Sequence, residues 1–164
     1  MPKILIFAPC DKVIVSEQDN TTSLISLIEA FTIGISEDAE VPEDASIPLK
    51  WHILALWERL EGEEGKNFEQ RTQFILPNGR EGLGGTMTLD FKPESKRFRA
   101  VSIILGFPVS PSGACVLKLS VREVGQEDWQ DVADYSIYIT RVAAPAQEAE
   151  VINETAAAES TEVG

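Results

Sequence analysis

Apolar and polar residues alternate along the second half of this chain with a period of two, which is typical of half-buried β-strands. In residues 114–123, Cys115, Leu117, Leu119 and Val121 fall on one side of the predicted strand, and mostly polar residues fall on the other. The same alternation predicts strands at 85–92, 98–107 and 131–141. This half of the chain is therefore expected to be a series of short strands.

The predicted strand at 98–107 is the most apolar of these segments. Its residues Val101, Ile103, Leu105 and Phe107 are spaced two apart and are expected to share one face. In the strand at 131–141, the residues Tyr135, Ile137 and Ile139 are expected to share a face in the same way.

The first half of the chain contains further apolar-rich runs, each bounded by turn-forming residues. They lie at 3–8, 12–17, 22–33, 50–60 and 67–76. The last run alternates from Phe68 and ends at the sequence Pro77–Asn78–Gly79, a strong turn signal. Short runs of period two with such boundaries predict an all-β fold, an antiparallel β-sandwich of about seven to nine strands.

The pattern leaves the secondary structure of one segment, residues 46–61, open. Leu49, Ile53 and Leu60 recur at helical spacing, so an amphipathic helix also fits. The run that follows alternates as a strand, and the Gly-containing connection between the two is short enough for a hairpin. We therefore favour a strand. A similar ambiguity affects 22–31.

His52, the only histidine of the chain, lies in this segment between Trp51 and Trp57. On a strand, His52 would share a face with Leu54 and Leu56, and the two tryptophans would share the other. No nucleophile-bearing turn and no recognisable partner accompanies it. We interpret His52 as a structural or interface residue.

The composition changes after Arg141. The remaining residues include five glutamates and many Ala, Ser and Thr, but no Lys, Arg or aromatic residue. Such a segment cannot bury enough apolar area to offset the entropy lost on ordering. The sequence therefore predicts a β-sandwich domain at 1–142 and an acidic, disordered tail at 143–164.

Several segments carry a resemblance to a known group of proteins. They are "CDKVIVSE", "NTTSLISLIEAFTI", "EGEEGKNFEQRTQFILPNG", "GFPVSPSGACVLKLSV" and the closing "YSIYIT". Together they resemble small bacterial β-sandwich proteins of unknown function over about residues 3–142. The stretch "PSGACVLKLSV" is similar to the late hairpin of many immunoglobulin-like domains, with Cys115 where a tyrosine is frequent. The resemblance implies an immunoglobulin-like or C2-like sandwich and carries no activity, cofactor or site residue.

The charge of the chain is strongly acidic, with a formal net charge of −13 over 164 residues. Nucleic acid and anionic membranes repel such a protein unless its positive charge is concentrated. The densest basic cluster, Lys92, Lys96, Arg97 and Arg99, is interrupted by Glu94 and is typical of a solvated hairpin. We expect no nucleic-acid partner.

The N-terminal apolar run is too short for a signal-peptide core, and no segment approaches the ~20 apolar residues of a membrane-spanning helix. The two cysteines, Cys10 and Cys115, match neither a disulfide framework nor a zinc site. These features predict a cytoplasmic protein with reduced thiols and no membrane span.

Two further groups of residues are candidates for binding. The glycine-rich stretch 78–86 leads into a strand rather than a helix, so we interpret it as a hairpin connection and not as a phosphate-binding loop. The acidic loop 37–44 contains Asp38, Glu40, Glu43 and Asp44, which are candidate calcium ligands. The loop lacks the closely spaced aspartates that calcium sites favour.

Taken together, the residues predict a non-enzymatic protein–protein interaction or structural module without a cofactor. Apolar residues on both faces of the segments around Trp51 and 22–31 predict more apolar surface than one sandwich interior holds. We therefore expect another protein as partner, including a second copy of the chain. The alternative is a calcium- or ligand-binding sandwich domain that uses the acidic loop.

Overall fold

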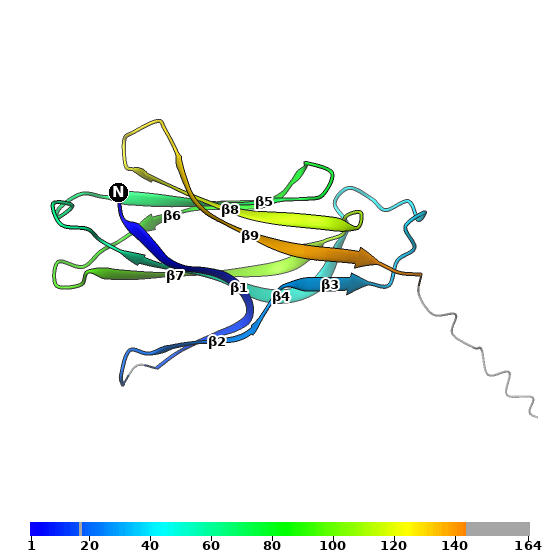
Figure 1. Cartoon of the computed structure of the whole chain (residues 1–164), viewed down its shortest axis with the longest axis horizontal. Coiled ribbons are helices and arrows are strands. Elements are labelled where there is room, and N and C mark those ends of the chain that lie inside the picture. The colour runs from blue at the N-terminus through cyan, green and yellow to red at the C-terminus, as the bar shows by residue number, and fades with distance from the viewer. Residues whose placement is uncertain (17, 144–164) are drawn as a thin grey trace, which may run out of the picture.

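The computed structural model describes residues 1–16 and 18–143, and in these residues the chain is all-β (Figure 1). The strands are β1 (Lys3–Val15), β2 (Thr22–Leu27), β3 (Ala30–Ile33), β4 (Ser46–Glu58), β5 (Phe68–Ile75), β6 (Glu81–Leu89), β7 (Arg97–Pro108), β8 (Gly113–Glu123) and β9 (Gln130–Arg141). They form two facing sheets, so the predicted β-sandwich is confirmed. The predicted tail at 143–164 lies outside the described residues, except for Ala143.

The two sheets have the strand orders β2-β1-β4-β7, here called sheet A, and β3-β9-β8-β5-β6, here called sheet B. Paired strands of the described chain are antiparallel, with one exception: β3 runs parallel to β9. The chain leaves sheet A after Leu27 and enters sheet B at Ala30. The run predicted at 22–33 is therefore two strands in different sheets.

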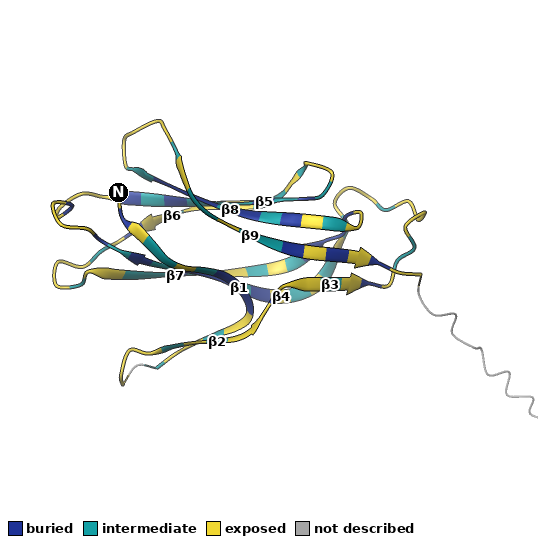
Figure 2. Ribbon diagram, in the orientation of Figure 1, coloured by how far each residue is buried: buried dark blue, intermediate teal, exposed yellow. Residues whose placement is uncertain are grey.

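Buried residues lie along strands of both sheets (Figure 2). The core lies between the sheets, and β4 supplies its two largest fully buried side chains. Trp51 and Trp57 are both buried, as the strand interpretation of this segment requires. Trp51 packs with Phe74 and Phe107 in one cluster, and Trp57 with Phe68 in a second. Because one chain buries both tryptophans, the apolar surplus that the sequence indicated at them is not available to a partner.

Four residues of β7 were predicted to share one face, and this prediction is wrong for Phe107. Val101, Ile103 and Leu105 lie opposite outward-facing residues of β4, but Phe107 is fully buried in the core. The change of face occurs at Gly106, whose φ of 88° lies in the left-handed region that glycine adopts without strain. The indole nitrogen of Trp51 donates to the carbonyl oxygen of Gly106 at 3.0 Å.

The second half of β1 and β2 form a hairpin that turns away from β4 beneath sheet A (Figure 1). At its tip, the guanidinium of Arg99 donates to the carbonyl oxygen of Asn20 at 3.1 Å. At its base, the Nδ1–H of His52 donates to the carbonyl oxygen of Asp11 at 2.7 Å. Leu54, which shares this face of β4 with His52 and lies opposite Ala8 of β1, is also buried. Part of the outer face of sheet A is therefore a second, smaller buried layer, to which His52 belongs.

The strand predicted to begin at residue 85 begins at Glu81, so Gly82, Gly84 and Gly85 lie within β6 and not in a turn. Cys10 and Cys115 are both buried and free. Within the described ranges, we find no helix of the length and hydrophobicity needed to cross a membrane.

Candidate binding cleft between β6 and β7

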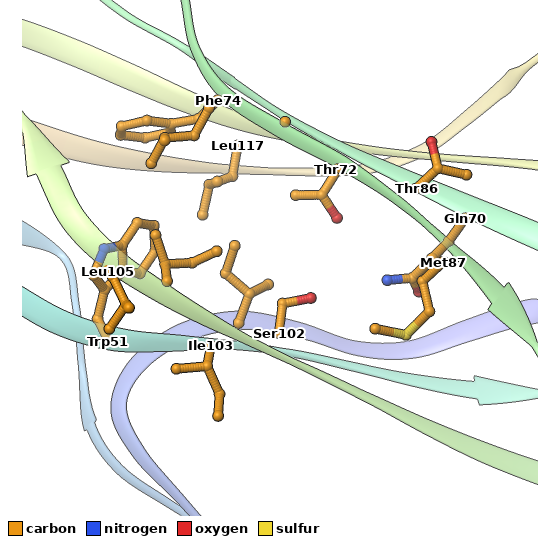
Figure 3. Close-up of a pocket in the computed structure, with 15 residues that line it drawn as sticks. Trp51, Gln70, Thr72, Phe74, Thr86, Met87, Ser102, Ile103, Leu105 and Leu117 are labelled. Carbon is orange, nitrogen blue, oxygen red and sulfur yellow. The ribbon is translucent and has the colours of Figure 1, made fainter. Parts of the chain in front are cut away.

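The two sheets leave an open side where their edge strands, β6 and β7, face each other. Among the described residues, each of these strands has a hydrogen-bonded neighbour on one side only, β5 for β6 and β4 for β7. A cleft of about 300 Å³ enters the sandwich between them (Figure 3). Its volume is at the lower end of the range for ligand sites in proteins.

Apolar side chains from both sheets form the inner walls of the cleft. Trp51 and Ile53 come from β4, Phe74 from β5 and Leu117 from β8. The ring of Trp51 meets that of Phe74 edge-on, with the centroids 6.0 Å apart. The walls are therefore part of the packed core, and the cleft makes this part of the core accessible to a ligand.

The cleft exists because β6 carries glycine where a side chain would fill the space. Gly85 lies opposite Thr72, whose side chain lines the cleft. Apart from Gly85 itself and its two chain neighbours, no heavy atom of the described residues would lie within 4 Å of a Cβ atom at Gly85. Gly82, nearer the start of β6, differs: a Cβ atom there would lie 3.2 Å from Pro108 and 3.3 Å from Leu76. The sheets therefore touch at the start of β6 and separate around Gly85.

Three polar groups reach into this apolar cleft. Gln70 is only 3% exposed, and its Oε1 accepts a hydrogen bond from the Trp57 indole at 2.7 Å. Its amide nitrogen points into the cleft in Figure 3. The hydroxyl groups of Thr72 and Ser102 also line the space. An apolar ligand with one or two hydrogen-bonding groups would contact the apolar walls and form hydrogen bonds with these polar groups.

The rim of the cleft on β7 exposes two large apolar side chains. Ile103 is 58% exposed and Leu105 is 76% exposed, and both line the cleft mouth. From Ala100 to Val109 this edge carries no charged residue, in a chain of net charge −13. Edge strands that stay unpaired usually carry charges or proline that prevent pairing with another chain. The central part of β7 lacks those features.

The candidate calcium ligands of the acidic loop are not gathered into a cation site. Asp38, Glu40, Glu43 and Asp44 are all exposed, and the described residues contain no group of three or more possible ligands close enough to hold an ion. Instead, cationic Arg141 lies against the loop and donates to the carbonyl oxygen of Ala39 at 3.1 Å.

The basic cluster and the cysteines are also placed by the structure. Arg97 lies 3.9 Å from the carboxylate of Glu58, and Arg99 is bound to Asn20, so neither guanidinium is free of neighbours. Burial raises the pKa of the Cys115 thiol to about 11, and burial together with the charge of Asp11 raises the pKa of Cys10. Both thiols are therefore protonated at neutral pH and are weak nucleophiles.

Sequence reasoning missed the cleft, although two of its signals are visible in the sequence. The adjacent glycines Gly84 and Gly85, inside an alternating strand, indicate a place where no side chain fills the space beside the strand. We interpreted them as part of a hairpin connection. The uncharged run around Ile103 and Leu105 was interpreted as an ordinary strand face. What the sequence did not indicate is that these two segments lie opposite each other.

No protein-family model and no curated protein sequence matches this chain. The resemblance to small bacterial β-sandwich proteins therefore stays a prediction, and the function must be argued from the cleft itself.

Proposed function

We propose that the protein is a non-enzymatic protein-interaction module, and that it binds an extended, apolar segment of a partner protein at the open side of the sandwich. The observation that carries this proposal is the position of the apolar cleft between two unpaired strand edges. Backbone groups of an edge strand provide affinity for an added strand, and pockets for alternate side chains provide specificity.

β7 is the edge that suits such an added strand. Its central residues carry no charge, and Ile103 and Leu105 offer apolar contact area at the cleft mouth. A strand paired with β7 directs every second side chain toward the interior of the sandwich. We expect one aliphatic side chain to enter the space beside Gly85, with its neighbouring backbone near the amide nitrogen of Gln70.

The chemistry of the cleft supports binding rather than catalysis. None of the described residues that line it is His, Cys, Asp, Glu, Lys or Arg, so the cleft offers no general acid or base of the usual kind. His52 lies on the outer face of β4, bound to the backbone of Asp11. We place the protein in the cytoplasm as part of this proposal, because its two free, buried thiols fit a reducing compartment.

A selection from random displayed peptides of about twelve residues, the length of β7, tests this function. We expect enriched sequences with apolar residues at alternate positions and little negative charge. Binding of the synthetic peptides should change the fluorescence of Trp51, which lines the cleft, and this change should be lost in Trp51→Phe.

A matched pair of leucine substitutions locates the binding surface. Leu105→Lys places a charge at the cleft mouth and should weaken peptide binding by about tenfold or more. Leu27→Lys makes the same change at another exposed leucine, on β2, and should leave binding unchanged. Equal loss in both variants, or enrichment of peptides without alternating apolar residues, would contradict the proposal.

A further inference from the structure

A second pocket, separate from the β6–β7 cleft, lies where the acidic loop meets the β5–β6 turn and the end of β9. It has a volume of about 210 Å³. The side chains of Arg80 and Arg141 both line it, together with Ser110, Asn78 and Glu43. Two of the chain's 14 basic side chains are thus brought to one small space.

Arg141 is the more unusual of the two arginines. It is the last residue of β9 and is only 8% exposed. One terminal nitrogen of its guanidinium donates to the carbonyl oxygen of Ala39 at 3.1 Å, but its Nε is buried without a hydrogen-bond partner in the described structure. No carboxylate of the described residues lies within ion-pair distance of it. A guanidinium taken out of water without a counter-charge destabilises the fold considerably.

Arg80, in the turn between β5 and β6, shares with Arg141 a buried Nε and the lack of an ion pair among the described residues. Its backbone N–H donates to the side-chain oxygen of Asn78 at 3.1 Å, which fixes the turn between β5 and β6. Its buried Nε has no hydrogen-bond partner in the described structure. Glu43 lines the same pocket but is exposed and makes no ion pair with either arginine. Two like charges therefore share a pocket in which neither forms an ion pair with a carboxylate of the described residues.

We propose that this pocket binds a carboxylate between the guanidinium groups of Arg80 and Arg141. Guanidinium groups bind carboxylates through pairs of parallel N–H···O bonds, and neither guanidinium of this pocket has a carboxylate partner among the described residues. The Ser110 hydroxyl and the Asn78 amide lie in the same lining and add polar contacts. A carboxylate fits better than a phosphate, because the neighbouring acidic loop repels a second negative charge.

The carboxylate has two possible sources that share this chemistry. It belongs either to a small free acid or to one of the five glutamates at 148, 150, 154, 159 and 162, which follow Arg141 in the sequence. A full-length variant with all five glutamates changed to glutamine separates the two sources without shortening the chain. The inference does not depend on the function proposed for the β6–β7 cleft.

The test is a titration of sodium acetate into the full-length protein, followed by the NMR signals of the arginine Nε–H groups. The signals are assigned with Arg80→Lys and Arg141→Lys. Sodium chloride at the same ionic strength controls for screening. We expect saturable shifts of both signals with a common midpoint, in the wild type or in the five-glutamine variant. Arg80→Gln should weaken acetate binding by about tenfold or more, whereas Arg97→Gln, at an exposed arginine of β7, should not.

Each outcome decides the inference. Saturation in both proteins supports a site for a free acid, and saturation only in the five-glutamine variant supports a site that the chain's own glutamates occupy. The absence of saturable shifts in both proteins overturns the inference, as do equal shifts with chloride. If Arg141→Lys fails to fold, Arg80→Gln still gives the answer, because Arg80 lies in a turn and is only partly buried.

Discussion

Replacing Trp57 by alanine is expected to lower the free energy of unfolding by about 3–5 kcal/mol. The indole is 0% exposed and packs against Phe68, Leu89 and Leu119 between the two sheets. Domains of this kind are stable by only about 5–15 kcal/mol, so the variant should be marginally folded. Urea unfolding followed by far-ultraviolet circular dichroism measures the loss, since that signal does not depend on tryptophan.

A double-mutant cycle separates the hydrogen bond of Trp57 from its packing. Trp57→Phe keeps most of the packing but leaves the buried Oε1 of Gln70 without its donor, at a cost of about 1–3 kcal/mol. Gln70→Leu removes the acceptor, and the combined variant should lose clearly less than the sum of the two single changes. Strict additivity would show that the Trp57–Gln70 bond contributes nothing to the fold.

Gly85→Leu is expected to abolish binding of the selected peptides while stabilising the free protein. The added side chain occupies the space that a partner's aliphatic side chain would take, so the affinity should fall by about tenfold or more. The same side chain buries apolar surface and replaces glycine within a strand, which together should raise the free energy of unfolding by about 1–2 kcal/mol. Isothermal titration calorimetry and urea unfolding measure the two effects.

Gly34→Leu is the matched control for this prediction. A Cβ atom at Gly34 would also contact no heavy atom within 4 Å beyond the adjacent residues. This glycine comes directly after β3, which is the edge strand of sheet B opposite β6. We expect unchanged peptide affinity there. Peptide binding that survives in Gly85→Leu would show that the cleft is not where the peptide side chain enters, even if the peptide still pairs with a strand edge.

Much of the fold follows from alternation along single strands. In β8, Cys115, Leu117, Leu119 and Val121 are all buried, as their spacing of two predicts. The pattern works there because β8 lies between two hydrogen-bonded neighbours and has one face in the core throughout. The helix that also fitted the segment around Trp51 is excluded by the pairing of β4 with both β1 and β7.

Where the predicted strands or faces are wrong, the cause is local, and the alternation of apolar and polar residues does not reveal it. Gly106 in β7 adopts a positive φ and moves Phe107 to the opposite face from Ile103 and Leu105. In β1, the strand continues through Pro9 to pair with β2, where the sequence indicated two separate strands. Backbone conformations at single residues decide such features, and hydrophobic patterning is insensitive to them.

The candidate sites were harder to predict than the fold, because each depends on residues distant in sequence. The cleft joins Gly85 with Leu105 across two sheets, and the arginine pocket joins Arg80 with Arg141. The acidic loop was visible in the sequence, but the arginines that lie against it were not. Charge along the chain therefore suggested only an alternative cation site, at a place where the fold puts cationic side chains.

If β7 binds a partner as we propose, it pairs with an added strand at its free edge. Amide hydrogen exchange of β7, with and without a selected peptide, measures this pairing. In the free protein, every second amide between Val101 and Phe107 faces the unpaired edge and should exchange fast. We expect the bound peptide to slow the exchange of these amides by about tenfold or more. Protection confined to the β1–β2 hairpin or to the loops, with β7 unchanged, would contradict it.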